Sequence, residues 1–477
     1  ETSFRGFPFA GLVEKDETQI TEVGSGTRFK EVNEYDWEVR DPSQDADGDL
    51  ENYALELAHQ SSATYDLNVG QKPIRTVEVD REFDQLGNLE SVRQRYLRDG
   101  VPPEKLTTVF EWEIDTGHWA FTPTARTDTH ETNDGRTETR RYELENEASF
   151  CKGCTTAGNV IGLRAKSITR DPDDLSHRLK EEYFYDDYGN VTEVKHHGFV
   201  ESRSTTTAFE QENTFPTEIA NALGHTGRVT WDPILGKPVK VVSPYGVEMY
   251  LTYDRFGRLL SRQTIDRDGN SVGDLLTIGY SKVADSSRLQ TTTVHLDGVA
   301  ATTEHDTFGR VITSIRTGVD QHVEQHIAFD QFGRVARVSK ALPVGDPPKE
   351  GIRYRYDGIG RIKQRQLVDA SVNWGAGPAI NQLTIYRQDY AGLTETHTEP
   401  EGHQTKYEVD ALGQITRVED AKGTAFCYRY APFGGIDRVA NGCEKPPWRE
   451  LVEYHRDRWS RITKLVDPSG RGTREYD

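Results

Sequence analysis

The sequence predicts an all-β protein, a long antiparallel sheet built from repeated hairpins. The first observation is a seven-residue motif that recurs along the chain: an aromatic or apolar residue, Asp, two residues, Gly, a polar residue and an aliphatic residue. The second is its spacing, because the copies at Asp306, Asp330 and Asp357 leave room for two strands and two turns each. The third is the alternation of apolar and polar residues between copies, as in residues 334–339, which is typical of strands.

The Asp and Gly of each motif are expected to form a tight turn. An Asp at the first turn position accepts backbone N–H groups a few residues on, and a Gly three residues later adopts the positive φ that closes a bulged hairpin. The aromatic residue before and the aliphatic residue after are strand formers that pair across the ladder. We predict an architectural role for these residues: Asp84, Gly87, Asp186, Gly189, Asp254, Gly257, Asp306, Gly309, Asp330, Gly333, Asp357, Gly360, Asp410 and Gly413.

Three regions follow one another along the chain. Residues 1–80 are polar and irregular and are expected to lead into the sheet, with a loop at 41–49. Residues 81–214 hold two motif copies separated by an insertion rich in Thr, Arg and Glu. Residues 215–477 form the regular array, and a further copy begins at Tyr476-Asp477. We see no linker between these regions, so one continuous domain is expected.

These motifs resemble the YD repeats of the Rhs family, also called the YD-shell family. The longer unit of that family alternates Gly turns with Tyr-Asp turns, and the chain repeats this order at Asn221-Ala222-Leu223-Gly224-His225, Gly236-Lys237-Pro238, Pro244-Tyr245-Gly246 and Tyr253-Asp254. The beginning, Phe4-Arg5-Gly6-Phe7 followed by Val13-Glu14, resembles the segment that enters the shell in the B component of bacterial Tc toxin complexes.

The resemblance implies a hollow β-shell, spiralled from one continuous sheet, that encloses a toxic C-terminal polypeptide or folds on itself. Related shells occur in Rhs polymorphic toxins and in teneurin-type adhesion proteins. In the toxin members a core region plugs one end, and an aspartyl autoprotease there releases the cargo. The sequence has no counterpart of that core, so the resemblance implies no catalytic residue here. We expect the chain to be part of a longer, secreted or cell-surface protein of bacterial toxin type.

Composition agrees with a thin, wetted sheet and excludes some classes of protein. Hydrophobic residues make up 34% of the 477 residues, and the mean hydropathy of −0.73 is low for a thick core. The formal net charge is −20, from 58 basic and 78 acidic residues. Nucleic-acid binding is not expected, because contact with phosphates needs a basic surface. No apolar run approaches the length of a membrane span.

The four cysteines leave three alternatives open. Cys151 and Cys154 have the spacing of half a zinc knuckle, which Cys427 and Cys443 would complete as a four-thiolate site. Alternatively, Cys427 and Cys443 cap the two strands of one hairpin and form a disulfide. The third alternative is four free thiols.

Two further groups are weak candidates for metal ions. Asp266, Asp268, Asn270 and Asp274 place oxygens at positions 1, 3, 5 and 9 of a calcium-type loop, and Asp45, Asp47 and Asp49 do so in part. Plain Asp-Gly turns are the competing interpretation. Residues 322–326 carry His, Glu and His at alternate positions, which share one strand face; we expect a solvated face there. We therefore expect no bound metal and no cofactor.

The sequence thus predicts a structural role, the encapsulation of a toxic C-terminal polypeptide, and no enzymatic activity. The expected partners are the remainder of the same shell or a partner shell subunit, the enclosed toxin polypeptide, and a delivery or translocation component. The alternative function is a cell-surface adhesion or carbohydrate-binding protein built on the same repeat. A wide cavity would favour encapsulation, whereas exposed aromatic rows on an open sheet would favour adhesion.

Overall fold

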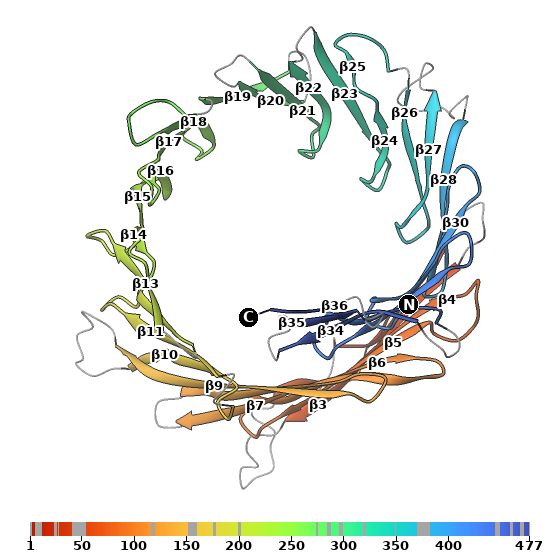
Figure 1. The fold of residues 1–477 in the computed structure, drawn as a ribbon, viewed down its shortest axis with the longest axis horizontal. Coiled ribbons are helices and arrows are strands. Elements are labelled where there is room, and N and C mark those ends of the chain that lie inside the picture. Colours follow the sequence, from red (N-terminus) through yellow and green to blue (C-terminus); the bar gives the residue numbers. More distant parts are fainter. Residues whose placement is uncertain are drawn as a thin grey trace.

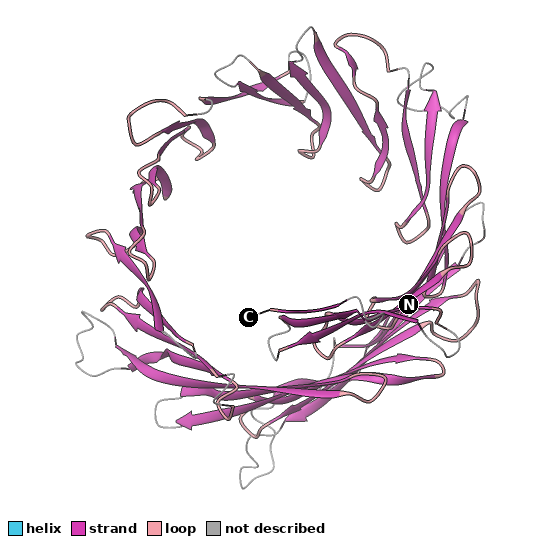
Figure 2. Cartoon of the chain, in the orientation of Figure 1, coloured by secondary structure: helices cyan, strands magenta, loops and turns pink. Residues whose placement is uncertain are grey.

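The computed structural model confirms the all-β prediction, because strands and loops make up the described part of the chain and no helix occurs there (Figure 2). The structure describes residues 2–4, 12–22, 26, 28–40, 54–115, 120–150, 160–174, 178–198, 202–272, 275–283, 288–294, 299–317, 321–348, 350–369, 382–443, 449–457, 461–467 and 472–476. The predicted loop at 41–49 and the Cys151–Cys154 pair lie outside these residues. Among the described residues, no helix has the length and apolarity that a membrane crossing needs.

Within the described residues the sheet contains 36 strands. The first 18 are β1 (Thr2–Phe4), β2 (Val13–Thr21), β3 (Arg28–Arg40), β4 (Ala54–Asp66), β5 (Arg75–Phe83), β6 (Leu89–Arg98), β7 (Val101–Asp115), β8 (Ala120–Glu131), β9 (Thr137–Phe150), β10 (Val160–Arg170), β11 (Leu179–Tyr185), β12 (Val191–His197), β13 (Ser202–Phe209), β14 (Pro216–Ala220), β15 (Thr226–Asp232), β16 (Lys237–Val242), β17 (Glu248–Tyr253) and β18 (Leu259–Ile265). The remainder are β19 (Leu276–Lys282), β20 (Leu289–Val294), β21 (Ala300–His305), β22 (Val311–Thr317), β23 (His322–Phe329), β24 (Val335–Ser339), β25 (Leu342–Pro343), β26 (Glu350–Tyr356), β27 (Ile362–Asp369), β28 (Gln382–Ala391), β29 (Thr394–Thr398), β30 (Gln404–Val409), β31 (Ile415–Glu419), β32 (Ala425–Tyr430), β33 (Ile436–Asn441), β34 (Arg449–Arg456), β35 (Ile462–Asp467) and β36 (Gly472–Glu475).

The strands form one antiparallel meander in which each strand pairs with its neighbours in sequence. The exception is the short β25, which pairs with β23 inside the connection from β24 to β26, while β24 and β26 pair directly. The stretch between the motif copies at Asp84 and Asp186, which the sequence suggested as an insertion, forms the long strands β7–β10 of the same sheet. Thr, Arg and Glu suit these strands because their aliphatic stems pack on the sheet while their polar ends reach water.

The sheet curls into a ring, and its C-terminal strands return to its N-terminal strands (Figure 1). We call β1–β25 the first coil and β26–β36 the second coil. Contacts between residues about 300 positions apart in the chain, such as Arg136 with Asp437, hold the coils together. A flat sheet of this length would expose two long edges, and overlap of the coils covers part of them.

The apolar core is small, as the hydropathy predicts. Among the described residues, the buried apolar side chains are Phe29, Val32, Ala125, Ala411, Ala425 and Ala440. Buried polar and charged side chains outnumber them and include Glu104, Asp128, His130 and Asp437. Stability must therefore come largely from backbone ladders, turn hydrogen bonds and half-buried side chains on a single layer rather than from a thick core.

Candidate functional site

The motif turn at Asp254 shows how the repeat works. One carboxylate oxygen of Asp254 accepts the backbone N–H of Phe256 at 2.9 Å and that of Arg258 at 2.9 Å. The Gly257 N–H donates to the Asp254 carbonyl at 2.9 Å, and the φ of Gly257 is 74°. The ladder shifts register between Thr252 and Tyr253, directly before the turn. The result is a bulged hairpin end in which the N–H groups of Asp254, Phe256, Gly257 and Arg258 all have acceptors.

All seven motif copies singled out in the sequence have this geometry. The Asp carboxylate accepts the N–H two residues on at 2.8–3.1 Å and the N–H four residues on at 2.8–2.9 Å. The seven glycines have φ between 74° and 92°. A side chain other than Gly would be strained at this φ, which explains the fixed Asp-to-Gly spacing.

The ionised form of the turn Asp is favoured in most copies. Burial alone would raise the pKa of Asp84, but hydrogen bonds from the Asn88 side chain and from three backbone N–H groups outweigh it, and the pKa is lowered. The same balance lowers the pKa of the carboxyl groups of Asp186, Asp254, Asp306 and Asp330. In these five turns the hydrogen bonds therefore favour the charged carboxylate.

The polar residue of the motif has a role that the sequence did not reveal. In four copies it is an Arg whose Nε donates to the turn Asp at 2.7 Å. The same guanidinium lies over the aromatic ring of the next hairpin, with 4.4 Å from Arg258 to the Tyr280 centroid and 3.9 Å from Arg361 to that of Tyr390. Each such Arg is thus held by an ion pair within its own turn and joins that turn to the following hairpin by a cation–π contact.

The aromatic residues form a second connection between hairpins. The hydroxyl group of Tyr253 donates to the Pro238 carbonyl at 3.0 Å, and that of Tyr356 donates to the Val335 carbonyl at 2.7 Å. Trp231 replaces the hydroxyl with its indole N–H, 2.7 Å from the Pro216 carbonyl. The same contact recurs at Trp37, Trp112, Tyr185, Tyr280, Tyr390 and Tyr430. Each donor reaches a carbonyl of the preceding strand, so bulged hairpin ends are joined one to the next.

Successive turns of an antiparallel meander alternate between the two edges of the sheet, and the motif turns all lie on one of them. We call this the YD edge; its described turns include 84–88, 186–190, 232–236, 254–258, 306–310, 330–334, 357–361, 391–394, 410–414 and 431–435. We call the opposite one the far edge; its described turns include 67–74, 132–136, 221–225, 243–247, 266–270, 399–403 and 420–424. Far-edge turns use Asn221, Asp266 or Asp420 as the side-chain acceptor.

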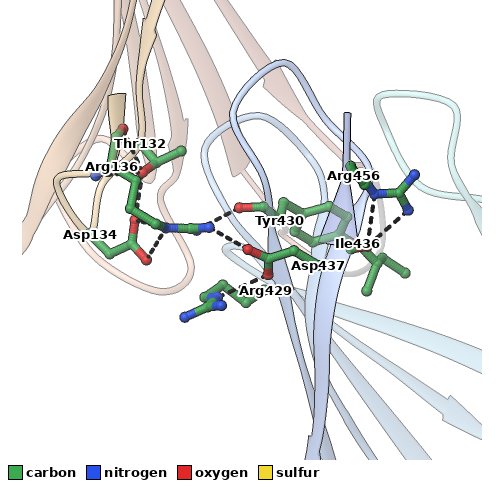
Figure 3. A network of polar contacts seen from close by, with 8 residues as sticks. All are labelled: Thr132, Asp134, Arg136, Arg429, Tyr430, Ile436, Asp437 and Arg456. Atoms are coloured by element: carbon green, nitrogen blue, oxygen red, sulfur yellow. Dashed lines mark hydrogen bonds and ion pairs between the residues drawn. The ribbon is translucent and has the colours of Figure 1, made fainter. Parts of the chain in front are cut away.

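The two coils meet along a seam in which YD-edge turns of the second coil lie on far-edge turns of the first. Figure 3 shows one such contact. Arg136, which Asp134 orients at 2.9 Å, pairs with Asp437 and donates to the Tyr430 carbonyl at 2.6 Å. Asp437 also accepts from Arg429 at 2.9 Å. Arg136 of the first coil is therefore bound at two points by the β32–β33 hairpin of the second coil.

The seam repeats with a constant offset. The turn between β26 and β27 lies on that between β2 and β3, where Lys363 pairs with Glu22 at 3.3 Å. The next hairpin end donates from the Gly392 N–H to the Asp66 carboxylate at 3.2 Å, between β4 and β5. The β30–β31 turn lies near the β6–β7 turn, and the β32–β33 turn lies on the β8–β9 turn. Each of these four contacts therefore joins strands whose labels differ by 24.

A buried polar pair lies where the β32–β33 turn meets the first coil. His130 and Glu104 are both buried and lie 2.8 Å apart, Nε2 to Oε1. The Phe433 N–H donates to Nδ1 of His130 at 2.5 Å, so the Nε2 atom carries the proton that Glu104 accepts. The Phe433 ring packs edge-on against the His130 ring at 5.4 Å, and Arg140 lies 4.3 Å above it. Burial, together with the charge of Glu104, raises the pKa of the nearby Asp410 carboxyl.

The weak metal candidates are placed in other roles. The Asp266 carboxylate accepts the N–H groups of Asp268 and Asn270 at 2.9 Å and 2.8 Å, as in a motif turn, while Asp274 lies outside the described residues. Among the described residues, no group of three His, Cys, Asp or Glu side chains is arranged to hold a metal ion. The strand face at 322–326 is not fully solvated as expected, because Glu324 is buried and accepts the Gly345 N–H at 3.1 Å.

The hairpin ends at β32 and β33 bring the predicted cysteine pair together. Cys427 lies in β32, and Cys443 lies two residues beyond the end of β33. The structure joins them in a disulfide with a Cα–Cα distance of 5.7 Å. This bond ties the far-edge end of the hairpin whose YD-edge turn carries Phe433.

One cavity of about 700 Å³ lies on the sheet beside an aromatic pair. The Phe215 and Trp231 rings stack at 5.1 Å with an angle of 17° between them. Glu218 and Arg228, which pair at 2.8 Å, line the same cavity. The sequence did not single out this site, although an aromatic residue before an Asp turn was the signal that could have marked Trp231.

No protein-family model and no curated protein matches the chain. Among solved structures, the crystal structure of TcdB2-TccC3 is similar with a TM-score of 0.63 and 11% identity, over 96% of this chain and 29% of that one. The chain has the Rhs/YD-shell fold. Two further structures are similar. TcdB2-TccC3-Cdc42 has a TM-score of 0.44 and 13% identity, over 96% of this chain and 27% of that one. The Photorhabdus luminescens Tc holotoxin pore has a TM-score of 0.45 and 13% identity, over 99% of this chain and 26% of that one.

The shell fold confirms the resemblance that the Asp-x-x-Gly motifs suggested. At 11% identity the similarity establishes the fold alone, and the chain spans 29% of the length of the TcdB2-TccC3 chain. Within this YD shell the motif turns, the inter-hairpin Arg and aromatic contacts, and the seam are the features that determine the path of the sheet.

Proposed function

We propose that the chain is part of the wall of a hollow shell that encloses a toxin polypeptide in a Tc- or Rhs-type toxin, secreted or exposed at the cell surface. The observation that carries this proposal is the path of the sheet, which curls into a ring and overlaps itself along the seam (Figure 1). The role is non-enzymatic. A closed wall would deny the enclosed polypeptide both its targets and the room to fold.

The seam is the feature that an open adhesion sheet would not need. At four successive hairpins, turns of the second coil contact turns of the first coil, and these contacts close the ring. The proposed partners are the rest of the shell or a partner shell subunit, the enclosed polypeptide and a delivery component. Within this wall we propose that residues 1–80 lead into the sheet, that 81–214 form its irregular part and that 215–477 form the regular array.

A cryo-EM map of the chain in its native assembly tests encapsulation directly. We expect a spiral of strands around a space that holds density not accounted for by the wall. An empty space or an open sheet would contradict the proposal. Protease digestion gives a second readout: Arg136→Ala should open the seam and expose the enclosed polypeptide to cleavage. Arg141→Ala, which removes an ion pair with Glu111 inside the first coil, is the matched control and should leave the cargo protected.

A second candidate function rests on the aromatic cavity. Stacked rings beside a carboxylate and a guanidinium, as at Phe215, Trp231, Glu218 and Arg228, also suit a sugar, whose apolar face packs on aromatic rings while its hydroxyls bond to charged groups. Titration of the chain with a glycan panel, followed by tryptophan fluorescence, tests this alternative. A saturable change that Trp231→Ala abolishes would favour carbohydrate binding. The absence of any change would leave encapsulation as the function of the sheet.

A further inference from the structure

A row of apolar side chains stands out from the YD edge of the first coil. In each motif turn, the residue before the Gly lies at the tip. The exposed fractions of these first-coil tips are Leu86 41%, Tyr188 61%, Phe256 71%, Phe308 82% and Phe332 72%. Ile234, two residues before Gly236 in the turn 232–236, is 92% exposed. Large side chains on turn tips cost solubility when they remain in water, so a row of them marks an interaction surface.

The corresponding tips of the second coil show what such residues contact. Leu412 and Phe433 are only part-exposed, because their hairpin ends lie on the far edge of the first coil. Phe433 packs against the imidazole of His130 and the guanidinium of Arg140, while its backbone N–H is bound by His130. Leu412 and Phe433 are thus partly covered in the seam, while Ile359, the tip of the seam turn 357–361, stays 44% exposed.

The far edge is also free over the middle of the first coil. Its turns at 221–225 and 243–247 carry Leu223 and Tyr245, which are 79% and 76% exposed. His225 lies 6.1 Å from the Tyr245 ring, so this edge offers apolar and imidazole groups of the kind that receive Phe433 in the seam. Both halves of a seam contact are thus present on one chain. The rings of Phe256, Phe308 and Phe332 remain strongly exposed, although arginines of their own turns lie 4.9–5.5 Å from the ring centroids.

We propose that the row formed by Phe256, Phe308 and Phe332 docks on the far edge, around Leu223 and Tyr245, of a second copy of this chain. The contact continues the seam beyond a single chain. Because the two edges are different surfaces, the association is heterologous, and each added copy leaves one YD edge and one far edge free. Copies should therefore stack coil upon coil. This inference stands apart from encapsulation, since it concerns the edges of the wall and not what the wall encloses.

Sedimentation velocity of the intact chain in 0.15 M salt tests the proposal, because that salt screens much of the repulsion between chains of net charge −20. We expect a concentration-dependent series of oligomers. The triple variant Phe256→Ser, Phe308→Ser, Phe332→Ser should raise the dissociation constant at least about tenfold, a loss that tip residues acting as hot spots would produce. Phe184→Ser, Tyr386→Ser, Val109→Ser, which removes exposed apolar groups from strand faces, is the control and should associate like the wild type.

A complementation experiment makes the test specific for edge-to-edge docking. The triple tip variant has an intact far edge. A far-edge variant, Leu223→Ser with Tyr245→Ser, has intact tips. Each alone should be monomeric, and an equimolar mixture should form a 1:1 complex that grows no further. A monomeric wild type at up to about 100 µM, where even a micromolar contact is populated, would overturn the proposal. So would equal losses in the tip and control variants, or tip-dependent binding to phosphatidylserine vesicles without self-association.

Discussion

At the scale of the residue, the Asp of each motif turn is an acceptor for two backbone N–H groups, and the Gly provides the conformation that brings those groups to it. The Gly cannot be replaced without loss, because its φ is positive. The role does not require Asp in every turn, because Asn221 accepts the N–H groups of Leu223 and His225 at 3.0 Å in the same way. Thus the acceptor oxygen is essential to the turn, and the charge is an additional contribution.

Replacing Gly257 by Ala should destabilise its hairpin by about 1–2 kcal/mol, the cost of a Cβ in the left-handed region. Space is not the reason, since the added Cβ would meet only the flexible end of Lys237 at 3.7 Å. Hydrogen exchange of the β17–β18 amides measures the local opening free energy. Gly227→Ala is the control: its φ is not positive and its Cβ would make an ordinary 3.6 Å contact, so protection should stay the same or rise.

The Asp410→Asn variant should become more stable relative to the wild type as pH rises. The pKa of Asp410 is raised by burial and by Glu104, so its contribution to stability is complete below the unfolded pKa near about 3.9 and is lost as pH rises through the folded pKa. Asn keeps the acceptor oxygen and cannot ionise. Asp84→Asn is the opposite case, because the pKa of Asp84 is lowered and its stabilisation is lost as pH falls.

Thermal unfolding at pH 4 and pH 7 compares these two variants. From pH 4 to pH 7, the midpoint of Asp410→Asn should rise relative to the wild type, while that of Asp84→Asn should fall. If the midpoints of both variants change in the same direction, the pKa of the seam residue Asp410 is not shifted in the opposite direction from that of Asp84, and the prediction is wrong.

At the scale of the element, a hairpin of this sheet is incomplete without the next one. Arg334 pairs with its own Asp330 and lies 4.4 Å from the ring of Tyr356 in the following hairpin, whose hydroxyl returns to Val335. Each hairpin is therefore fixed at its YD edge by groups from two repeats. This nearest-neighbour coupling is the arrangement by which repeat proteins replace a large core.

Replacing Tyr356 by Phe should cost about 1 kcal/mol of local stability, because the Val335 carbonyl loses its donor while the packing of the ring is kept. Exchange of the β24 and β26 amides reports the loss. Tyr250→Phe is the matched control, since its hydroxyl binds Glu248 on the exposed surface of the sheet and no backbone group depends on it. Equal effects of the two substitutions would assign the stabilisation to the ring instead of the hydroxyl.

The sequence predicted the local features of these elements and missed the non-local ones. Asp-x-x-Gly at Asp254 and Gly257 is read from four consecutive residues, so the turns could be placed directly. The contact from Arg258 to Tyr280 joins residues 22 positions apart, at a distance that changes from repeat to repeat. Spacing alone could not show it. Trp231 was also missed as a donor because it replaces the Tyr of the motif.

At the scale of the molecule, the ring closes because YD-edge turns of one coil fit far-edge turns of the other. The fit joins residues such as His130 and Phe433, 303 positions apart. No sequence pattern marks them as partners, since the number of strands per coil follows from the accumulated twist and bulging of many hairpins. The curling of the sheet was expected from the family resemblance and from the need of a long sheet to cover its edges, but the register of the seam was not expected.

The ion pair of Arg136 and Asp437 should be a coupled element of the seam, with an interaction energy of about 0.5–3 kcal/mol in a double-mutant cycle. Asp437 is only 13% exposed, and removing Arg136 leaves its carboxylate half-satisfied beside Arg429. Arg136→Ala should therefore increase hydrogen exchange in β32 and β33, hundreds of residues from the substitution, and expand the molecule in small-angle scattering as the second coil detaches.

The pair of Arg141 and Glu111, 2.6 Å apart within the first coil, is the control, and its loss should affect β7–β9 alone. If Arg136→Ala leaves exchange in β32 and β33 unchanged, the coils are held by backbone contacts such as Phe433 to His130, and closure of the ring does not depend on this charge.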